Sequence, residues 1–357
     1  MTKRLLLLNG LAVLMIPFHH ASAFGLQALF DWTNRYRPVS VPNYDQIGSV
    51  SYYALIFIRQ IDAYAIPAFL FVSGFFIAFM SRGKNLTLDS VLPRIKVLMI
   101  PLVIWTVIRF ALLRQMPSSV FDVFDTYYFL VLLIQFYLLS IFLVPWTRKN
   151  WVAVLILTAA IQLVSESPLY FQTIGMSFPG MGFIGLFTPR WLAPSRILYF
   201  TLGLVAGIHM NKFKAWLERS KWVLLGVMIG SLVLTFVEYW LLTIVSGQAW
   251  VGPNNPGIAR IVYATTFSLC FLAFSDLKLP YEKVIEDLGS KSLGIYLVNL
   301  PMMYIAAVLM YKFTPMLLGN MLVYMLVLMT VGIGTPLIFM EIVRRTPARV
   351  GYRYLFG

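Results

Sequence analysis

Charged residues and cysteine are both scarce in this sequence, and each scarcity excludes a class of protein. Aspartate, glutamate, lysine and arginine make up 12% of the 357 residues, against about 25% in a soluble globular domain. Hydrophobic residues make up 60%, which excludes a soluble enzyme and a disordered chain. The single cysteine, Cys270, has no intrachain partner, so the chain is not a disulfide scaffold. The composition is that of a polytopic membrane protein.

Long apolar segments run through the whole chain, and their lengths fit a bilayer. A helix needs about 20 apolar residues to cross the hydrocarbon core, and open sheet edges are not viable in lipid. We therefore expect an all-α, polytopic membrane helix bundle that forms a single domain over residues 1–357. The ten expected spans lie near 5–27, 64–81, 97–113, 127–146, 151–165, 195–210, 222–245, 258–275, 292–311 and 318–343.

Two further segments do not have the pattern of a clean span. Residues 52–63 are apolar but include Arg59, Gln60 and Asp62, which predicts an interfacial or partly buried helix. Residues 166–194 are rich in proline and glycine, which favours a re-entrant or pocket-lining loop.

The formal net charge of +14 is accounted for by membrane topology. Lysine and arginine concentrate in cytoplasmic loops. With the N-terminus inside, nineteen of the 28 basic residues fall in cytoplasmic segments and nine fall outside. An even number of spans then places both termini in the cytoplasm. The charge therefore requires no nucleic-acid partner.

The N-terminal segment imitates a secretory signal peptide, since Ala21-Ser22-Ala23 has the form of a cleavage site. The apolar run continues to Phe30, beyond the length of a signal peptide. We therefore expect the segment to be retained as the first span.

Two of the three histidines, His19 and His20, are adjacent and lie inside the first span. With the helix entering near Leu5, about 14 residues at 1.5 Å each place His19 roughly 21 Å in, in the outer half of the membrane. Ionisable groups in spans usually face a cavity, and histidine exchanges a proton near neutral pH. Adjacent side chains diverge by about 100° on a helix, so one of the two faces a given pocket. The alternative is a packed histidine that is hydrogen-bonded to a neighbouring backbone.

Other common kinds of catalytic site have no support in the sequence. Three histidines, two of them adjacent, give no ligand spacing such as HExxH, so no metal site is expected. There is also no G-x-S-x-G elbow and no P-loop. His209 lies at the inner end of the sixth span, where an interfacial role is expected.

Four other polar residues have both a structural and a functional interpretation. Ser73, in the apolar run 66–76, favours close helix packing. Arg94 and Lys96, at the inner end of the third span, are either topology anchors or a clamp for a phosphorylated cytosolic donor. Asn299, at mid-depth in the ninth span, either bonds across helices or lines a cavity.

A family resemblance covers nearly the whole chain and is carried by six segments. They are Ile16-Pro17-Phe18-His19, Tyr64 to Gly74, Arg94 to Pro101, Tyr128-Phe129-Leu130, Tyr199 to Gly207 and Gly289 to Pro301. In this order they resemble the acyltransferase-3 family of integral membrane acyltransferases, closest to the branch with periplasmic glucan succinyltransferases. Two positions depart from the family. Asn9 stands where an arginine usually precedes the first-span histidine by about eleven residues, and Asn299 replaces a late histidine.

The resemblance implies transfer of an acyl group, acetyl or succinyl, from cytosolic acyl-CoA to a hydroxyl of an extracytoplasmic glycan. His19 or His20 would be the general base. Asn9 or Asn299 would donate a hydrogen bond to the oxyanion of the tetrahedral intermediate. The implied partners are acyl-CoA, the glycan and the lipid bilayer of a bacterial cytoplasmic (inner) membrane, with no tightly bound cofactor; homo-oligomerisation is left open. The expected site residues are the catalytic His19 and His20 and the substrate-binding Asn9, Ser73, Arg94, Lys96 and Asn299.

Two alternative functions remain from the residues alone. A lipid or glycan transporter or flippase would also need a polar path through apolar helices, but the sequence has no inverted repeat and no paired broken helices. A divergent, non-catalytic family member is the other alternative, because of the two altered positions.

The topology is tested with reporter fusions. A reporter fused after Leu217 should read as cytoplasmic, and one fused after Gly252 as extracytoplasmic, because the basic residues favour the N-terminus inside. Alkaline phosphatase and green fluorescent protein activities measure the two sides. The opposite pattern would overturn the orientation.

Overall fold

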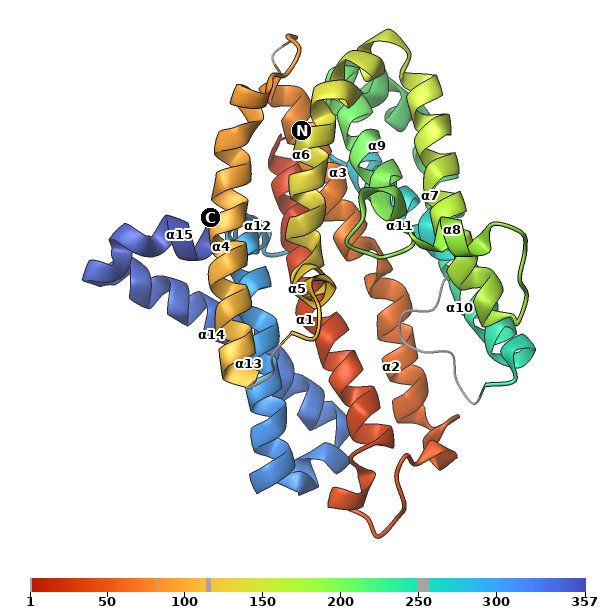
Figure 1. Cartoon of the computed structure of the whole chain (residues 1–357), viewed down its shortest axis with the longest axis vertical. Coiled ribbons are helices and arrows are strands. Elements are labelled where there is room, and N and C mark those ends of the chain that lie inside the picture. Colours follow the sequence, from red (N-terminus) through yellow and green to blue (C-terminus); the bar gives the residue numbers. More distant parts are fainter. Residues whose placement is uncertain (1, 82, 114–116, 249–256) are drawn as a thin grey trace.

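The computed structural model describes residues 2–81, 83–113, 117–248 and 257–357, and within these ranges it contains helices but no strand (Figure 1). This confirms the all-α prediction. The helices are α1 (Thr2–Phe30), α2 (Val50–Ile61), α3 (Ala65–Met80), α4 (Leu88–Leu113), α5 (Val120–Thr126), α6 (Tyr128–Lys149), α7 (Trp151–Thr173), α8 (Met181–Gly185), α9 (Ile197–Ile208), α10 (Met210–Ser246), α11 (Ile258–Ala273), α12 (Glu282–Ser290), α13 (Ser292–Phe313), α14 (Met321–Arg345) and α15 (Tyr352–Phe356).

Eight helical segments in the described ranges are long and apolar enough to cross a membrane. They account for eight of the ten expected spans. The other two expected spans, 195–210 and 258–275, correspond to the shorter apolar helices Ala193–Ile208 and Ile258–Ala273. Most of α9 and much of α11 are buried among other helices. The ends of α9 and α11 can therefore lie inside the membrane, because neighbouring helices cover their backbone there.

The second span begins earlier than expected. Helix α2 covers the segment that was expected to be interfacial or partly buried, and its Arg59 and Gln60 are buried. A 3₁₀ turn at Asp62–Tyr64 joins α2 to α3, and together they form one candidate span, Val50–Met80. The charged residues thus lie inside the bundle.

The fifth span ends later than expected. Helix α7 continues to Thr173 instead of ending near residue 165, because Pro168 is accommodated inside the helix. Only the part of 166–194 after Thr173 therefore forms a loop, with the short α8 within it. The carbonyl of Trp191 in this loop accepts a hydrogen bond from Gln135 Nε2 of α6 at 2.6 Å. This bond fastens the loop to the bundle.

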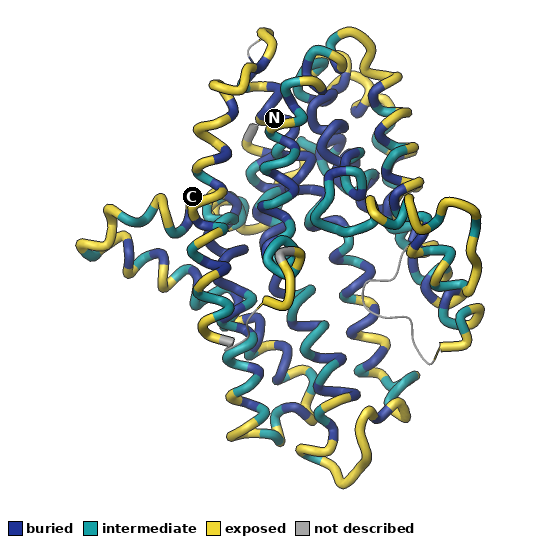
Figure 2. The backbone as a smooth tube through the Cα atoms, viewed as in Figure 1, coloured by how far each residue is buried: buried dark blue, intermediate teal, exposed yellow. Residues whose placement is uncertain are grey.

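The outer faces of the bundle are apolar, as a lipid environment requires. Figure 2 shows buried residues along the inward faces of the helices and exposed ones along the outside. Val107 of α4, Phe142 of α6 and Leu322 of α14 are 63%, 69% and 71% exposed. Large exposed apolar surfaces of this kind mark an interaction site, here the membrane.

Glycine allows a very close helix contact between α3 and α9 (Figure 1). A Cβ atom on Gly74 would lie 2.1 Å from the Phe200 carbonyl oxygen, and one on Gly203 would lie 2.0 Å from that of Phe71. Small residues let membrane helices approach in this way. The apolar run around Ser73 is expected to favour close helix packing, and Gly74 in this run makes such a contact.

The α3–α9 contact predicts an unequal effect of two alanine substitutions. Gly74→Ala should lower stability by about 1–3 kcal/mol or more, because its methyl group meets backbone that cannot move aside. Gly226→Ala in α10 is the matched control, since nothing lies within 4 Å of its Cβ position. Melting temperatures of the purified variants measure the difference. Equal values would contradict the close packing.

Candidate active site

The junction of α2 and α3 places a carboxylate inside the bundle. Asp62 ends α2, where its backbone N–H donates to the carbonyls of Ile58 and Gln60. The chain then makes its 3₁₀ turn, and the Asp62 residue is only 3% exposed. A carboxylate at this depth needs a partner, since an unpaired buried charge is strongly destabilising.

The partner of Asp62 is the His19 ring of α1. The His19 Nδ1 atom lies 3.1 Å from Asp62 Oδ2. On the other side of the ring, Nε2 lies 3.5 Å from Nη2 of Arg59, which can only donate. These partners assign the neutral tautomer in which Nδ1–H donates to Asp62 and Nε2 carries the lone pair. A base held by a carboxylate in this way is the arrangement of many nucleophilic and general-base sites.

Arg59 ties α2 to α1 around this histidine. Its Nη1 donates to the His19 carbonyl oxygen at 3.4 Å and to Ser22 Oγ at 3.3 Å. The Ser22 hydroxyl in turn donates to the His19 carbonyl at 2.8 Å. Arg59 is 3% exposed, so the guanidinium is held at the histidine by the surrounding protein.

Helix α11 supports the same junction from the other side. Arg260 Nη2 donates to the Arg59 carbonyl oxygen at 3.5 Å. The Tyr263 hydroxyl donates to the Ile61 carbonyl oxygen at 3.0 Å. Both carbonyls lie in the last turn of α2.

The histidine is accessible, whereas its carboxylate is not. The His19 side chain is 31% exposed, against 1% for the Asp62 side chain. Because His19 lies well inside α1, the exposed part of its ring lies at membrane depth. A reacting group could therefore meet the ring while Asp62 stays shielded.

His20 contacts His19 and shares the electrostatic influence of Arg59 with it. The two rings meet edge to face with their centroids 5.6 Å apart. Arg59, Arg109 and Arg190 act on His20 electrostatically. The structure thus brings the two histidines together, but it pairs only His19 with a carboxylate.

Two ion pairs join the segment between α7 and α9 to α5 and to α7. Arg190 Nε and Nη2 donate to the two carboxylate oxygens of Asp125 at 2.7 and 2.6 Å. Arg196 pairs with Glu166 of α7. These side chains are between 19% and 45% exposed, so they form a partly exposed polar cluster.

The two asparagines make local contacts. Asn9 Nδ2 donates to the Gly289 carbonyl at 3.0 Å and to Ser292 Oγ at 2.9 Å, which fastens α1 to α12 and α13. Asn299 is fully buried, and its Nδ2 donates to carbonyls of its own helix, at Ile295 and Tyr296.

The remaining three expected residues lie on α3 and α4. Ser73 is half-buried beside the α3–α9 contact, and Arg94 and Lys96 are exposed on α4. Arg94 Nε contacts the Met80 sulfur at 2.8 Å. Within the described residues, no hydrogen bond or ion pair joins these three side chains to His19 or His20.

Sequence reasoning missed Arg59 and Asp62 as site residues. The signal was present, because both are charged residues inside an apolar segment, and such residues usually mark functional positions. By themselves they predict an interfacial or partly buried helix. Their meeting with His19 depends on contacts across 40 and 43 residues of sequence, which no local pattern reports.

In the ranges that the structure describes, no group of three or more histidine, cysteine, aspartate or glutamate side chains could hold a metal ion.

Comparisons with known proteins point to one family. A family model described as an acyltransferase domain matches residues 4–340. The chain is 27% identical over 275 residues to a protein named "Putative membrane-bound acyltransferase YfiQ" from Bacillus subtilis (strain 168), a match that covers 71% of each chain. No solved structure matches the chain significantly.

The partial exposure of the His19 side chain predicts a contrast in cysteine labelling. His19→Cys should react with a membrane-impermeant, charged methanethiosulfonate, because the side chain is 31% exposed and a thiolate forms only in water. Ser22→Cys, one turn along the same helix, should not react, because Ser22 is fully buried. The native Cys270 is 5% exposed and serves as an internal blank. An unlabelled His19→Cys variant would mean that water does not reach this position.

Proposed function

The chain belongs to the acyltransferase-3 family of membrane acyltransferases, and from this premise we propose that it moves an acetyl or succinyl group from cytosolic acyl-CoA to a hydroxyl of an extracytoplasmic glycan. The proposed location is a bacterial cytoplasmic membrane. The observation that carries the proposal is the His19–Asp62 pair, since it supplies a base inside an apolar bundle.

His19 is the proposed general base. Its Nε2 takes the proton of the acceptor hydroxyl as the hydroxyl oxygen attacks the thioester carbonyl. The tetrahedral intermediate then collapses, the carbon–sulfur bond breaks, and the departing thiolate of CoA takes the proton back from the imidazolium. General-base catalysis of this kind contributes about 10²–10⁴ in rate.

Asp62 positions the base. Its hydrogen bond to Nδ1 keeps the lone pair on Nε2 and stabilises the imidazolium that forms during transfer. Because the carboxylate is almost fully buried, water screens this interaction little.

Arg59 is the proposed donor to the oxyanion. Its guanidinium lies beside Nε2, where the thioester carbonyl must approach for the acceptor to lose its proton to His19. A fixed donor aimed at developing negative charge is commonly the largest single catalytic contribution. Arg59 replaces Asn9 in this role, since the Asn9 amide is engaged with α12 and α13.

The depth of the site supports an extracytoplasmic acceptor. With the N-terminus inside, His19 lies in the outer half of the membrane, roughly 21 Å from the entry of α1. The partly exposed polar cluster offers many hydrogen-bonding groups to a glycan. It consists of Arg190, Asp125, Arg196 and Glu166.

The function is tested by glycan O-acylation in membranes with radiolabelled acetyl-CoA and succinyl-CoA. His19→Gln should lower transfer by about 10²-fold or more, because it removes the base. Asp62→Asn should lower it strongly as well, because an amide can hold the histidine in the wrong tautomer. His20→Gln should have a smaller effect than His19→Gln. Rates are corrected for protein level.

His209→Gln is the matched control. This histidine lies at the far end of α9, where its Nε2 meets the Thr147 carbonyl at 3.3 Å. Full activity of His19→Gln, or equal losses in His19→Gln and His209→Gln, would contradict the proposed mechanism. A wild type that transfers neither acyl group would contradict the proposed donors.

A further inference from the structure

Arg109 is a charged residue in a candidate membrane span that the proposed mechanism does not use. It lies on α4, one turn before the helix ends at Leu113. With the N-terminus inside, this is the extracytoplasmic end of α4. The Arg109 side chain is half-buried. Charged residues in spans usually face the bundle interior or a water-filled cavity, and they often mark functional positions.

The surroundings of Arg109 place its guanidinium toward the inside of the bundle. Helix α4 packs against α6 and α13 (Figure 1). Arg109 acts electrostatically on the Tyr127 hydroxyl, which is buried before α6 and donates to the Leu297 carbonyl of α13 at 3.1 Å. It also acts on the His20 ring of α1. Arg109 therefore faces groups of three neighbouring helices rather than only the lipid.

Arg109 has no anionic partner in the part of the chain that the structure describes. None of the hydrogen bonds and ion pairs there involves its side chain. The Asp122 carboxylate of α5 is engaged elsewhere, because it accepts from the backbone N–H groups of Ser118 and Ser119 at 2.8 and 3.1 Å. A half-buried charge at this depth is costly without compensation.

Positive charge also exceeds negative charge around the two histidines. We counted the charged groups that contribute most at the histidines and at their partners, and we added the carboxylate that caps α11 beside Arg260. The arginines are Arg59, Arg109, Arg190, Arg196 and Arg260, and the carboxylates are Asp62, Asp125, Glu166 and Glu238. One positive charge remains even when every carboxylate is ionised.

The excess positive charge lies on the His20 side of the site. Besides His19, the groups that act most strongly on His20 are three arginines, which include Arg109. His19 differs, because its Nδ1 lies 3.1 Å from Asp62 Oδ2. The centroids of the two histidine rings are 5.6 Å apart. An anion beside His20 would therefore lie next to the proposed base.

Arg190 extends this positive region toward the surface. Its Nε and Nη2 donate to Asp125 at 2.7 and 2.6 Å, and its Cζ lies 4.7 Å from the centroid of the Tyr128 ring. These contacts fix the guanidinium, although the side chain is 41% exposed. An arginine has more N–H donors than this pair uses. Arg190 can therefore donate to a ligand while Asp125 holds it in place.

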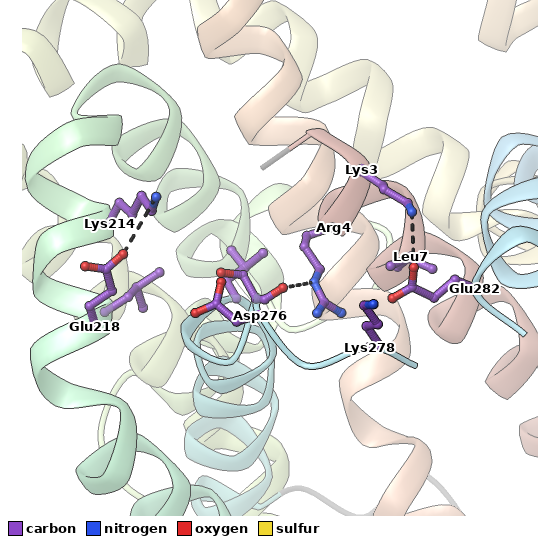
Figure 3. A pocket seen from close by; sticks show the side chains of 11 residues that line it. Lys3, Arg4, Leu7, Lys214, Glu218, Asp276, Lys278 and Glu282 are labelled. Carbon is purple, nitrogen blue, oxygen red and sulfur yellow. Dashed lines mark hydrogen bonds and ion pairs between the residues drawn. The ribbon is translucent and has the colours of Figure 1, made fainter. Parts of the chain in front are cut away.

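The charged cavity of about 420 Å³ at the beginning of α1 offers its lysines a different environment. Figure 3 shows Lys3 beside Glu282 and Lys214 beside Glu218, at 3.1 and 3.7 Å. The two lysine side chains are 60% and 64% exposed, so water solvates their charges. The need for a compensating anion is therefore greater at Arg109 than at these lysines.

We propose that Arg109 binds an anionic group of the acceptor, so that the acceptor is an acidic glycan with its carboxylate or phosphate beside His20 and its reacting hydroxyl at His19. The inference rests on the proposed function, of which it names the acceptor class. A guanidinium suits this role, because its planar N–H donors match the oxygens of carboxylates and phosphates. The extracytoplasmic end of α4 is also the side from which the acceptor arrives.

Binding of trigalacturonate to the purified full chain in neutral-lipid nanodiscs tests the proposal without acyl transfer. Its methyl ester is the uncharged probe with the same sugars. The wild type should bind trigalacturonate more tightly than the ester. Arg109→Gln should weaken trigalacturonate binding about tenfold or more, as expected for a lost hydrogen bond to a charged group, and should leave ester binding unchanged. Arg109→Lys should keep most of the preference, because it keeps the charge. Calorimetry measures the affinities.

Arg37→Gln is the matched control. Arg37 also lies on the extracytoplasmic side, but it is exposed, and its Cζ lies 5.9 Å from the centroid of the Tyr36 ring. It should bind both probes like the wild type. An equal loss in Arg37→Gln would show a general charge effect and overturn the proposal. A wild type that binds the two probes equally, or an Arg109→Gln variant with wild-type affinities, would overturn it too. Size-exclusion profiles confirm that each variant is folded.

Transfer assays separate the source of the anion and the proposed function. A selective loss of succinyl transfer relative to acetyl transfer in Arg109→Gln, with unchanged trigalacturonate binding, would place the succinyl carboxylate at Arg109 and overturn the acceptor assignment. Trigalacturonate binding that depends on Arg109, without acyl transfer by the wild type, would support the anion site and contradict the proposed function. Acyl transfer that is equally fast in the wild type and Arg109→Gln, with a neutral and an acidic glycan alike, would support the function and overturn the anion site.

Discussion

Charges buried in an apolar bundle must be paired, and the arrangement at the centre of this protein follows from that requirement. Arg59 and Asp62 are each 3% exposed and lie one turn apart at the end of α2. Leaving either one alone would cost several kcal/mol. The His19 ring of α1 lies between them, and Arg260 and Tyr263 of α11 donate to carbonyls in the last turn of α2. Three separate parts of the chain are thereby held in one position.

The pairing that stabilises the bundle also sets the chemistry of the histidine. A carboxylate on one ring nitrogen and a guanidinium on the other leave a single neutral tautomer. Because His19 is accessible and Asp62 is shielded, the base can meet a substrate while its partner remains in a poorly screened environment. In the proposed function, the contacts that pair the buried charges are also the contacts that orient the His19 ring for proton transfer.

The length of α1 gives the protein two chemically different ends. At its beginning, lysine and arginine side chains surround an open cavity with mixed apolar and charged lining. About 22 Å further along, the same helix carries the paired histidine. In the proposed function, the donor comes from one side of the membrane and the acceptor from the other, and the length of α1 covers the distance between the two sides.

The sequence by itself determined the fold class and most of the spans, and it predicted a functional role for His19 and His20. Apolar runs long enough to cross lipid can only be helices, and an ionisable residue inside such a run is expensive enough to indicate function. Only the tertiary structure decided the partners. Spacing along α1 favoured Asn9 as a site residue, yet its amide bonds to Gly289 and Ser292. Arg59 and Asp62 instead contact His19 from another helix. Periodicity describes one helix at a time, but which residue faces which depends on how helices distant in sequence pack, and that information lies in the contacts between them.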